Sequence, residues 1–599
     1  MARDLAPRIA LVIASTKLFL PPYDASASGF ERVFGANQRG VLGITAIALT
    51  SAAVLAGLQA VLLQHRPGLD TSSSSSFVSR TARFDPDPSR RREARLILAS
   101  RQADAPENQL RLIQNQGWGM ASTDQLLAPI SLKLEALALE KLKQPEQAKQ
   151  RWQYLLAQFP TAPPTADALY ALAKPKQLLL QFPAHPAALA AAVKWQQQNG
   201  GSLGGLHLAR YGQRWPGAGE AMAAACRKPE RPLQANEKQL LAAGLISQGD
   251  RAASNRCLGA TKTSTALEVE PISAATKAWL RSRELLLKGA WAQAYGSLVQ
   301  AKPDSQSPPI AARSRFWMGL CSWQLGDQAK ARAIWQNQLQ QYPFGYYAWR
   351  ARIRLGVIAP LPQTKGEGLL PAPLAKLESL GLHTEAWEHW RSWRLGRSPK
   401  TPGDLWREGQ LRLGVGDRWF GLGQLDTAAI EGAARTKAEQ TLLEIQRHPL
   451  NFQTELAAAA KKVDLDPLLL QGVARQESRL NTTVRSPAGA IGLLQIMPAT
   501  AEEVAGKKLT QINLEDASLN ANLGGQYLRQ MLTESNNNIF LAIASYNAGA
   551  GAAKSWPNKN LKQLPELWVE EIPYPETRIY VKSVLGNYFS YQQLNRLQQ

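Results

Sequence analysis

The stretch from residue 90 to residue 448 has one dominant pattern. Apolar residues recur there at three- and four-residue spacing, in segments that glycine and proline separate. The period-two alternation that a half-buried strand needs is almost absent. Each segment can bury one stripe as an amphipathic helix, but the stretch lacks the alternating faces from which a sheet is built. The pattern predicts a mainly α fold.

Some of these segments resemble one another at equal spacing. Residues 148–152 (AKQRW) are followed by Phe159, and residues 331–335 (ARAIW) by Tyr342, with a proline next in both cases. A small residue on one helical face, an aromatic residue one turn further on and a terminating proline suit antiparallel helix pairs that stack into a solenoid. We predict a long tetratricopeptide-like α-superhelix over residues 90–448.

The run from Val41 to Leu63 holds 23 residues and no charge. As a helix it would be about 34 Å long, enough to cross the hydrocarbon core of a bilayer. Arg32 and Arg39 precede it and would keep residues 1–40, the N-terminal tail, in the cytoplasm. We predict that the run (41–63) is an uncleaved membrane anchor, rather than a removed signal peptide or a buried globular helix. The rest of the chain would then be periplasmic.

A segment of biased composition follows this run. Residues 72–76 are all serine, and residues 85–88 read Asp-Pro-Asp-Pro. Such a composition offers little to bury and favours a flexible chain. We predict a flexible linker over residues 64–89.

The charge of the chain is unevenly distributed. The formal net charge is +22 for the whole chain and +1 for residues 451–599, so the basic excess lies upstream. Such an excess points to a polyanionic partner, and nucleic acid, a membrane surface or an anionic cell-wall polymer would each satisfy it. Because no motif or aromatic-interleaved basic strip supports nucleic acid, we expect none as a partner.

Three cysteines are too few and too scattered for a disulfide framework or a zinc site. One bridge, between Cys226 and Cys257, would form in an oxidising compartment. The alternative is that these two and Cys321 are buried thiols that pack as small hydrophobic residues, and the sequence favours this alternative.

Residues 451–599 contain no histidine and no cysteine. Their absence excludes Ser-His-Asp and Cys-His nucleophilic catalysis and His/Cys zinc sites from this region. Upstream, His383 and His389 are six residues apart, which does not place both on one helical face, and we expect neither a metal nor a cofactor. A carboxylate, a tyrosine or a lysine remains for proton transfer in the C-terminal region.

Glu477 is the strongest candidate for that role. Asp466 and Pro467 form a good helix start, and the helix that follows has an apolar stripe through Leu470 and Val473 that reaches Glu477. Burial disfavours the carboxylate anion, so a glutamate on such a stripe has a raised pKa, as a general acid near neutrality needs. The alternative is a helix-end glutamate paired in solvent with a neighbouring arginine, and this stripe alone does not decide between the two.

Three further segments provide candidate binding residues. The loop from Ser486 to Gly492 is rich in small residues, and Gln495 after it offers a donor and an acceptor to a sugar. An apolar helix from Ile539 ends sharply after Tyr546 and Asn547, which would present both side chains at its end. The last helix carries Glu576 in its first turn, where a structural role at the helix dipole is as credible as a role in binding.

Four ordered motifs in this region resemble those of the soluble lytic murein transglycosylases. They are Gln476-Glu477-Ser478, Ser486-Pro487-Ala488-Gly489-Ala490-x-Gly492-Leu493-x-Gln495-x-Met497-Pro498, Ser545-Tyr546-Asn547-Ala548-Gly549 and Glu576-Thr577-Arg578-x-Tyr580-Val581. Leu494 and Ser545 depart from the usual pattern, which has Met and Ala there. The resemblance implies a goose-type-lysozyme-like catalytic domain, over residues 449–599, and an upstream α-superhelix.

The resemblance also implies the reaction and its residues. The family cleaves the β-1,4 bond between N-acetylmuramic acid and N-acetylglucosamine without water and leaves a 1,6-anhydro muramoyl end. Glu477 would serve as acid and then as base. The implied substrate-binding residues are Ser486, Gln495, Met497, Tyr546, Asn547, Glu576 and Tyr580.

Two alternatives stay open. A hydrolytic muramidase would need a second carboxylate to activate water, and Glu570, Glu571 or Glu576 could supply it. A membrane-tethered repeat protein with an inactive domain would need no acid at all, yet Glu477 is present. We expect peptidoglycan glycan strands and, through the anchor, the membrane as partners; proteins of cell-wall synthesis or division are further candidates.

Overall fold

The computed structural model describes residues 69–598 except 71–72, 86, 103, 115–123, 260–272, 358–369, 487 and 511–512. The N-terminal tail and the predicted anchor over 41–63 lie outside the described residues. None of the helices in the described ranges combines the length and the apolar character that a membrane span requires.

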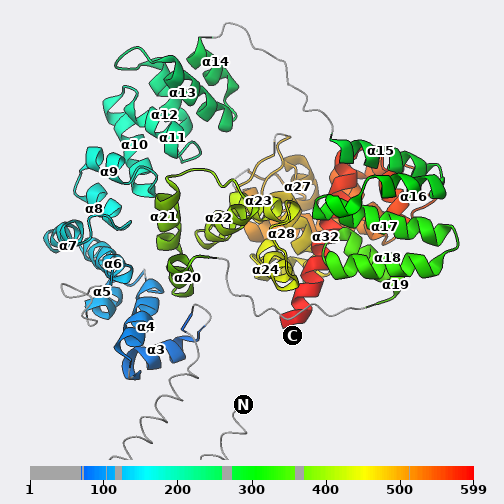
Figure 1. The fold of residues 1–599 in the computed structure, drawn as a ribbon, viewed down its shortest axis with the longest axis horizontal. Helices are drawn as coiled ribbons and strands as arrows, with labels where there is room; N and C mark the ends of the chain where they lie inside the picture. The colour runs from blue at the N-terminus through cyan, green and yellow to red at the C-terminus, as the bar shows by residue number, and fades with distance from the viewer. Residues whose placement is uncertain are drawn as a thin grey trace, which may run out of the picture. The chain divides into compact units, whose positions relative to one another are not determined.

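The described chain is mainly helical, as the sequence predicted (Figure 1). The helices up to residue 447, called the upstream helices here, are α3 (Ser75–Phe84), α4 (Pro88–Ser100), α5 (Pro106–Gln114), α6 (Leu127–Lys141), α7 (Pro145–Gln158), α8 (Thr165–Ala171), α9 (Pro175–Gln181), α10 (Pro186–Asn199), α11 (Leu203–Tyr211), α12 (Ala218–Arg227), α13 (Ala235–Ser247), α14 (Arg251–Leu258), α15 (Ala274–Leu287), α16 (Trp291–Gln300), η1 (Pro303–Ser305), α17 (Pro308–Gln324), α18 (Gln328–Gln341), α19 (Tyr346–Leu355), α20 (Ala372–Ser379), α21 (His383–Arg394), α22 (Pro402–Gly414), α23 (Arg418–Ile430) and α24 (Lys437–Arg447).

The C-terminal helices are α25 (Gln453–Lys462), α26 (Pro467–Ser478), α27 (Pro498–Ala505), η2 (Asn513–Glu515), α28 (Ala517–Glu534), α29 (Ile539–Ala548), α30 (Ala550–Lys554), α31 (Pro565–Glu571) and α32 (Pro575–Gln598). Two single-residue bridges, Arg485 to Ile491 and Ile491 to Ile496, fold the loop between α26 and α27 onto itself.

The two similar segments of the sequence occupy equivalent places in their helices. Ala148 and Trp152 are the buried face of α7, and Ala331 and Trp335 are the buried face of α18. Each helix packs against the one before it, α6 and α17 respectively. The small residue lets the paired helix approach, and the tryptophan fills the space one turn further on.

The prediction of a flexible linker over 64–89 is wrong for Ser75–Phe84, which is helix α3. Val78 and Ala82 lie four residues apart on one face of this helix, and both are buried in a cluster with Leu96 and Ile97 of α4. Packing against α4 outweighs the poor helix propensity of the serines, and Ser74 caps the helix by accepting a hydrogen bond from the backbone N–H of Phe77.

The cysteines also differ from the favoured expectation. Cys226 of α12 and Cys257 of α14 form a disulfide, whereas Cys321 is a free buried thiol. The pairing follows from tertiary packing, because both helices contact α13 and bring the two Cα atoms to 5.2 Å.

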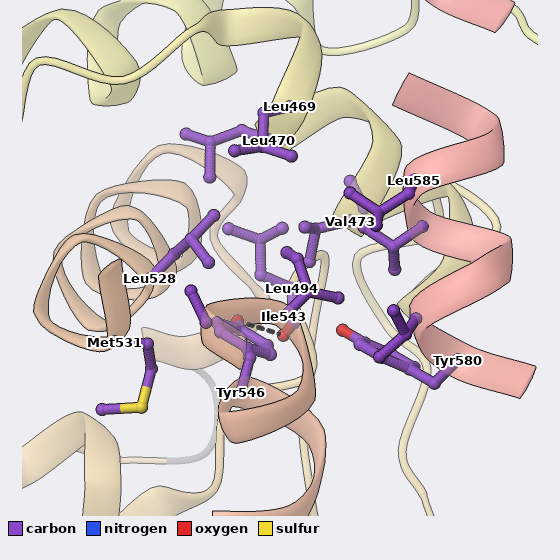
Figure 2. Packing of buried hydrophobic residues seen from close by; sticks show 14 of the residues in the cluster. Leu469, Leu470, Val473, Leu494, Leu528, Met531, Ile543, Tyr546, Tyr580 and Leu585 are labelled. Carbon is purple, nitrogen blue, oxygen red and sulfur yellow. Dashed lines mark hydrogen bonds between the residues drawn. The ribbon is translucent and has the colours of Figure 1, made fainter. Parts of the chain in front are cut away.

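The C-terminal helices share one apolar core (Figure 2). Leu470 and Val473 of α26, Ile543 of α29 and Leu585 of α32 meet there, and Leu494 enters from the loop before α27. All five side chains are buried, so the helix that bears Glu477 is held from several sides.

Two buried carboxylates join α31 to the upstream helices. Glu566 accepts hydrogen bonds from Arg350 and Arg354 of α19, and Glu570 contacts Arg283 of α15. Helix α19 also lies beside α32 (Figure 1), where a Cβ at Gly586 would come within 2.9 Å of the backbone of α19. The upstream helices therefore fix the position of α32.

Candidate active site

Helix α26 places Glu477 in its last turn. The side chain of Asp466 accepts a hydrogen bond from the backbone N–H of Leu468, and Pro467 is the first helical residue, which confirms the predicted helix start. The helix ends at Ser478 because Arg479 adopts the left-handed region, with φ of 49°. Ser478 donates hydrogen bonds to the carbonyl oxygens of Ala474 and Leu493, which holds this turn against the following loop.

Glu477 is half-buried and has one close polar partner. The Tyr580 hydroxyl of α32 donates a hydrogen bond of 2.6 Å to Oε1 of Glu477. Helices α26 and α32 come this close because Gly472 has no side chain at their contact; a Cβ there would lie 3.0 Å from the backbone nitrogen of Tyr588. Tyr580 is itself buried, so the pair lies away from bulk water on one side.

The environment raises the pKa of Glu477 to about 7. Burial is the largest cause, because it disfavours the anion; the hydrogen bond from Tyr580 acts in the opposite direction, and the negative charge of Glu576 raises the pKa further. A carboxyl with this pKa is protonated in a large fraction of molecules near neutral pH. The position of Glu477 on the apolar stripe of α26 therefore raises the pKa of its carboxyl, as the sequence predicted.

The alternative of a solvent ion pair for Glu477 is wrong in this structure. Arg475 pairs with Asp426 of α23 at 2.8 Å, and its guanidinium also donates to the carbonyl of Arg447. Arg479 stacks over Trp419 at 4.7 Å and donates to the carbonyl of the same residue. Both cations are thus held by α23 and its surroundings.

The loop between α26 and α27 is held largely by its own hydrogen bonds. The hydroxyl oxygen of Ser486 accepts from the backbone N–H of Ala490 at 3.0 Å. The side-chain amide of Gln495 donates to the carbonyls of Val484 and Gly492, both at 2.9 Å. The donor that we expected Gln495 to offer to a sugar is therefore engaged within the loop, while Met497 is 41% exposed.

Asn520 of α28 is a residue of this site that sequence reasoning missed. It is fully buried, its Oδ1 accepts from the backbone N–H of Leu494 at 2.7 Å, and its Nδ2 donates to the carbonyls of Ile491 and Leu514 at 2.9 Å. A Cβ at Gly492 would overlap this amide. The available signal was an asparagine between apolar residues of a helix, a position that needs polar partners.

Tyr546 and Asn547 lie differently from each other at the end of α29. Tyr546 is buried, and its hydroxyl donates to the carbonyl of Leu494 at 3.0 Å (Figure 2). The expectation that the helix end presents Tyr546 outward is therefore wrong, because this hydroxyl supports the loop. Asn547 is half-buried, and its Oδ1 accepts a hydrogen bond of 2.7 Å from Thr577 of α32.

The structure thus gathers some of the predicted residues around Glu477. Burial, and after it the nearby charge of Glu477, raises the pKa of the hydroxyls of Tyr546 and Tyr580, so both remain proton donors. Glu576 is exposed near this group. Ser486 and Met497 lie on the loop, and their contacts with a sugar stay predictions.

The carboxylates considered for water activation have distinct surroundings. Glu570 is buried, and Lys582 donates to it at 2.8 Å. Glu571 accepts from Asn560 at 2.6 Å. Of the three candidates, Glu576 is the one whose charge acts on Glu477.

One cluster among the described residues has the spacing of a metal site. Ligand atoms of Asp167, His185 and Glu388 lie within 4.8 Å of one another in the upstream helices. The ammonium of Lys133 already lies 3.0 Å from Asp167 and 2.8 Å from Glu388. Nδ1 of His185 accepts from the backbone N–H of Ala187, which leaves the ring proton on Nε2. A lysine therefore supplies the positive charge that this cluster needs.

A helical chain with a carboxyl whose pKa is about 7, beside two tyrosine hydroxyls, is equipped for acid–base chemistry on a neutral bond. The comparisons with known proteins agree with this interpretation. Residues 455–569 match the family described as "Transglycosylase SLT domain", and residues 313–344 match "Tetratricopeptide repeat". The resemblance to lytic murein transglycosylases that the motifs indicated is confirmed.

The similar curated proteins include two named "Soluble lytic murein transglycosylase". The one from Escherichia coli (strain K12) is 29% identical over 289 residues, 45% of this chain and 42% of that protein. The one from Salmonella typhimurium is 30% identical over 289 residues, with the same two shares. The matched region spans less than half the length of either relative. A solved structure, the lytic transglycosylase Slt from Pseudomonas aeruginosa, aligns with a TM-score of 0.42 and 20% identity, over 87% of this chain and 84% of that chain.

Proposed function

We propose that this protein is a lytic transglycosylase, a carbon–oxygen lyase that cleaves the β-1,4 bond between N-acetylmuramic acid and N-acetylglucosamine of peptidoglycan and leaves 1,6-anhydro-muramoyl ends. The single observation that carries the proposal is the half-buried Glu477, whose pKa of about 7 suits a proton donor at neutral pH. The match of residues 455–569 to the transglycosylase domain supports the substrate and the reaction.

The reaction needs one group that donates a proton and then accepts one. Protonated Glu477 gives its proton to the glycosidic oxygen as the bond to C1 breaks, and the released oxygen leaves as a hydroxyl. The resulting carboxylate takes the proton of the C6 hydroxyl while the C6 oxygen forms its bond to C1, and Glu477 is protonated again. The hydrogen bond from Tyr580 stabilises the anionic form between the two steps.

The remaining predicted residues would bind and orient the sugars. Glu576 lies near Glu477, and Asn547 accepts a hydrogen bond from Thr577, the residue after Glu576; both are candidates for the acetamido or muramoyl group. Ser486, Gln495 and Met497 would shape the sugar subsites through the loop, and Tyr546 would act by holding that loop at Leu494.

A hydrolytic muramidase is the second candidate. It needs a carboxylate that activates water, and Glu576 is the one that interacts with Glu477. The buried ion pairs of Glu570 and the hydrogen bond to Glu571 make these two poor choices. A non-catalytic peptidoglycan-binding repeat protein finds less support, since such a protein has no need of a carboxyl with a raised pKa.

The proposal extends to the rest of the chain. Residues 90–448 would form a tetratricopeptide-like superhelix that binds the anionic cell wall through its basic excess, and residues 449–599 a lysozyme-like catalytic domain. The protein would act in the periplasm, anchored to the inner membrane by residues 41–63. The disulfide between Cys226 and Cys257 is consistent with an oxidising compartment.

Digestion of purified sacculi with mass analysis of the products tests the proposal. The protein should release anhydro-muropeptides, each lighter by one water than the corresponding hydrolytic product. Glu477→Gln should release neither, while Glu146→Gln, at an exposed glutamate of α7, should behave as the parent. Release of hydrated products that Glu576→Gln abolishes would establish the hydrolase instead, and products from Glu477→Gln at the parent rate would remove the assignment.

A further inference from the structure

Helix α3 has an exposed side that the proposed reaction does not use. Its buried side lies against α4 (Figure 1). Its exposed side carries Ser76, Arg80, Arg83 and Phe84. These positions are i, i+4, i+7 and i+8 of one helix, so the four side chains share one side of it. We call this group of four residues the α3 face.

The α3 face combines an apolar ring with two cations. Phe84 is 72% exposed, and the guanidinium of Arg83 lies 5.8 Å from the centre of its ring. Arg80 is exposed one turn earlier in the helix. Among the described residues, no carboxylate lies within ion-pair distance of Arg80 or Arg83. Both positive charges are therefore left for a partner outside this part of the chain.

The surroundings of the α3 face do not neutralise it. Residues 75–101 contain seven arginines and three carboxylates, which gives a net charge of +4. Two of these carboxylates are already paired, Asp85 with Arg90 and Glu93 with Lys376 of α20. A surface of one sign attracts a partner of the opposite sign and repels one of its own. The charge therefore selects an anionic partner.

Two arginines at the ends of α4 hold both ends of α3. Arg101 donates a hydrogen bond of 3.0 Å to the carbonyl oxygen of Ser73, and Arg95 donates one of 3.1 Å to the carbonyl oxygen of Ala82. Val78 is fully buried between the two helices. Because these contacts fix α3 on α4, its exposed side has a set orientation, which lowers the ordering cost of binding a broad surface.

The sequence before α3 indicates which anionic partner the α3 face meets. Residues 64–74 separate the predicted anchor over 41–63 from α3. A chain of this length spans at most about 40 Å, so a bilayer crossed by the anchor would be within reach of α3. Arginine binds lipid phosphates well, and an aromatic ring is stabilised at the interface between membrane and water. A hydrated acidic polymer would satisfy the arginines but leave the ring of Phe84 in water.

We propose that the α3 face binds the anionic surface of the membrane, with Arg80 and Arg83 in contact with lipid phosphates and Phe84 within the headgroup layer. Each arginine close to an anionic membrane strengthens binding about fivefold. The contact orients the first upstream helices on the bilayer, so the chain is held there by more than its anchor. The choice of a membrane as the partner rests on the anchoring proposed above.

Fluorescence quenching of the labelled full chain on vesicles tests the α3 face. Ser79→Cys provides an exposed labelling position beside the face. The native cysteines do not compete for the label, because Cys226 and Cys257 are bonded to each other and burial raises the pKa of the Cys321 thiol to about 12. The vesicles carry a quencher on their headgroups and contain phosphatidylcholine, with or without phosphatidylglycerol. We expect strong quenching with phosphatidylglycerol that declines as salt is added, and weak quenching without it.

Two double variants assign the contact to particular residues. Arg80→Gln with Arg83→Gln should shift the binding equilibrium about thirtyfold towards the unbound state. Lys277→Gln with Arg281→Gln, at exposed positions of α15, removes the same charge and should behave as the parent. Phe84→Ser should weaken binding but leave its dependence on salt unchanged, since this dependence comes from the charges.

Equal quenching on both kinds of vesicle, no quenching on either, or equal losses in the two double variants would overturn the proposal. Tighter binding to soluble polygalacturonate than to the vesicles, abolished by Arg80→Gln with Arg83→Gln, would assign the α3 face to an acidic polymer and reject the membrane. Flotation with phosphatidylcholine vesicles tests the anchor separately, and sacculus digestion tests the lyase. Neither depends on these arginines, so failure of the α3 face leaves both proposals intact. If either of those fails, vesicles added to the labelled protein still decide whether the face binds them.

Discussion

Replacing Glu477 by glutamine should stabilise the folded protein at neutral and alkaline pH. Glutamine keeps the size of the side chain and an oxygen that can accept from Tyr580, but it cannot ionise. The parent must either keep a proton on Glu477 or bury an anion. Glutamine is neutral at every pH, so the variant never buries an anion at this position, and it also loses the proposed catalytic function.

The magnitude and sign follow from the pKa. Folding raises the pKa of Glu477 from 4.5 to about 7, so the folded state binds this proton more tightly than the unfolded state. Below pH 4.5 the protonated carboxyl contributes its full stability to the folded protein. This contribution declines as the pH rises and is lost above about pH 7. The ionised carboxyl therefore costs about 3 kcal/mol of stability in alkaline solution.

Urea unfolding of parent and variant across this pH range provides the measurement. The free-energy difference between Glu477→Gln and the parent should be near zero at the acid end and approach about 3 kcal/mol in favour of the variant at the alkaline end. Glu146→Gln, at an exposed position, should show no such trend. A difference that stays constant with pH would refute the raised pKa and the reasoning built on it.

Three further outcomes follow from the same contacts. Tyr580→Phe removes the donor that stabilises the carboxylate, so the pKa of Glu477 should rise. The alkaline limb of the pH profile of kcat/KM should then move up by about one pH unit, and a move to lower pH would contradict this. Asn520→Ala leaves two loop groups and one carbonyl of η2 without their partner, so it should cost about 2–4 kcal/mol in urea unfolding and lower kcat more than it changes KM, with Asn520→Asp intermediate. Unchanged stability would show that the loop does not depend on this amide. Reduction of the bridge between Cys226 and Cys257, 31 residues apart, should cost about 3–4 kcal/mol of stability in the helices that it joins. Dithiothreitol should therefore lower the thermal midpoint, and an unchanged midpoint would count against the bridge.

Local sequence patterns predicted the helical elements well. The Asp466-Pro467 start is set by capping and backbone preferences within a few residues, and the structure has it. The helix from Ile539 also ends close to the predicted place, although it continues past Asn547 to Ala548 before Gly549 ends it. The composition of residues 64–89 wrongly predicted a flexible linker at Ser75–Phe84. The burial of this helix depends on packing against α4, which a composition argument does not include.

The sequence by itself limited proton transfer in the C-terminal region to a carboxylate, a tyrosine or a lysine, since no histidine or cysteine is present, and it placed Glu477 on an apolar stripe. Only the tertiary structure decided what that stripe meets: Tyr580, 103 residues away, and a loop held by Asn520. It also decided that Glu570 belongs to ion pairs rather than to the candidate active site. The reason is that a helical pattern depends on neighbours a few residues apart, whereas a pKa depends on every group that packs around the carboxyl, wherever it lies in the chain.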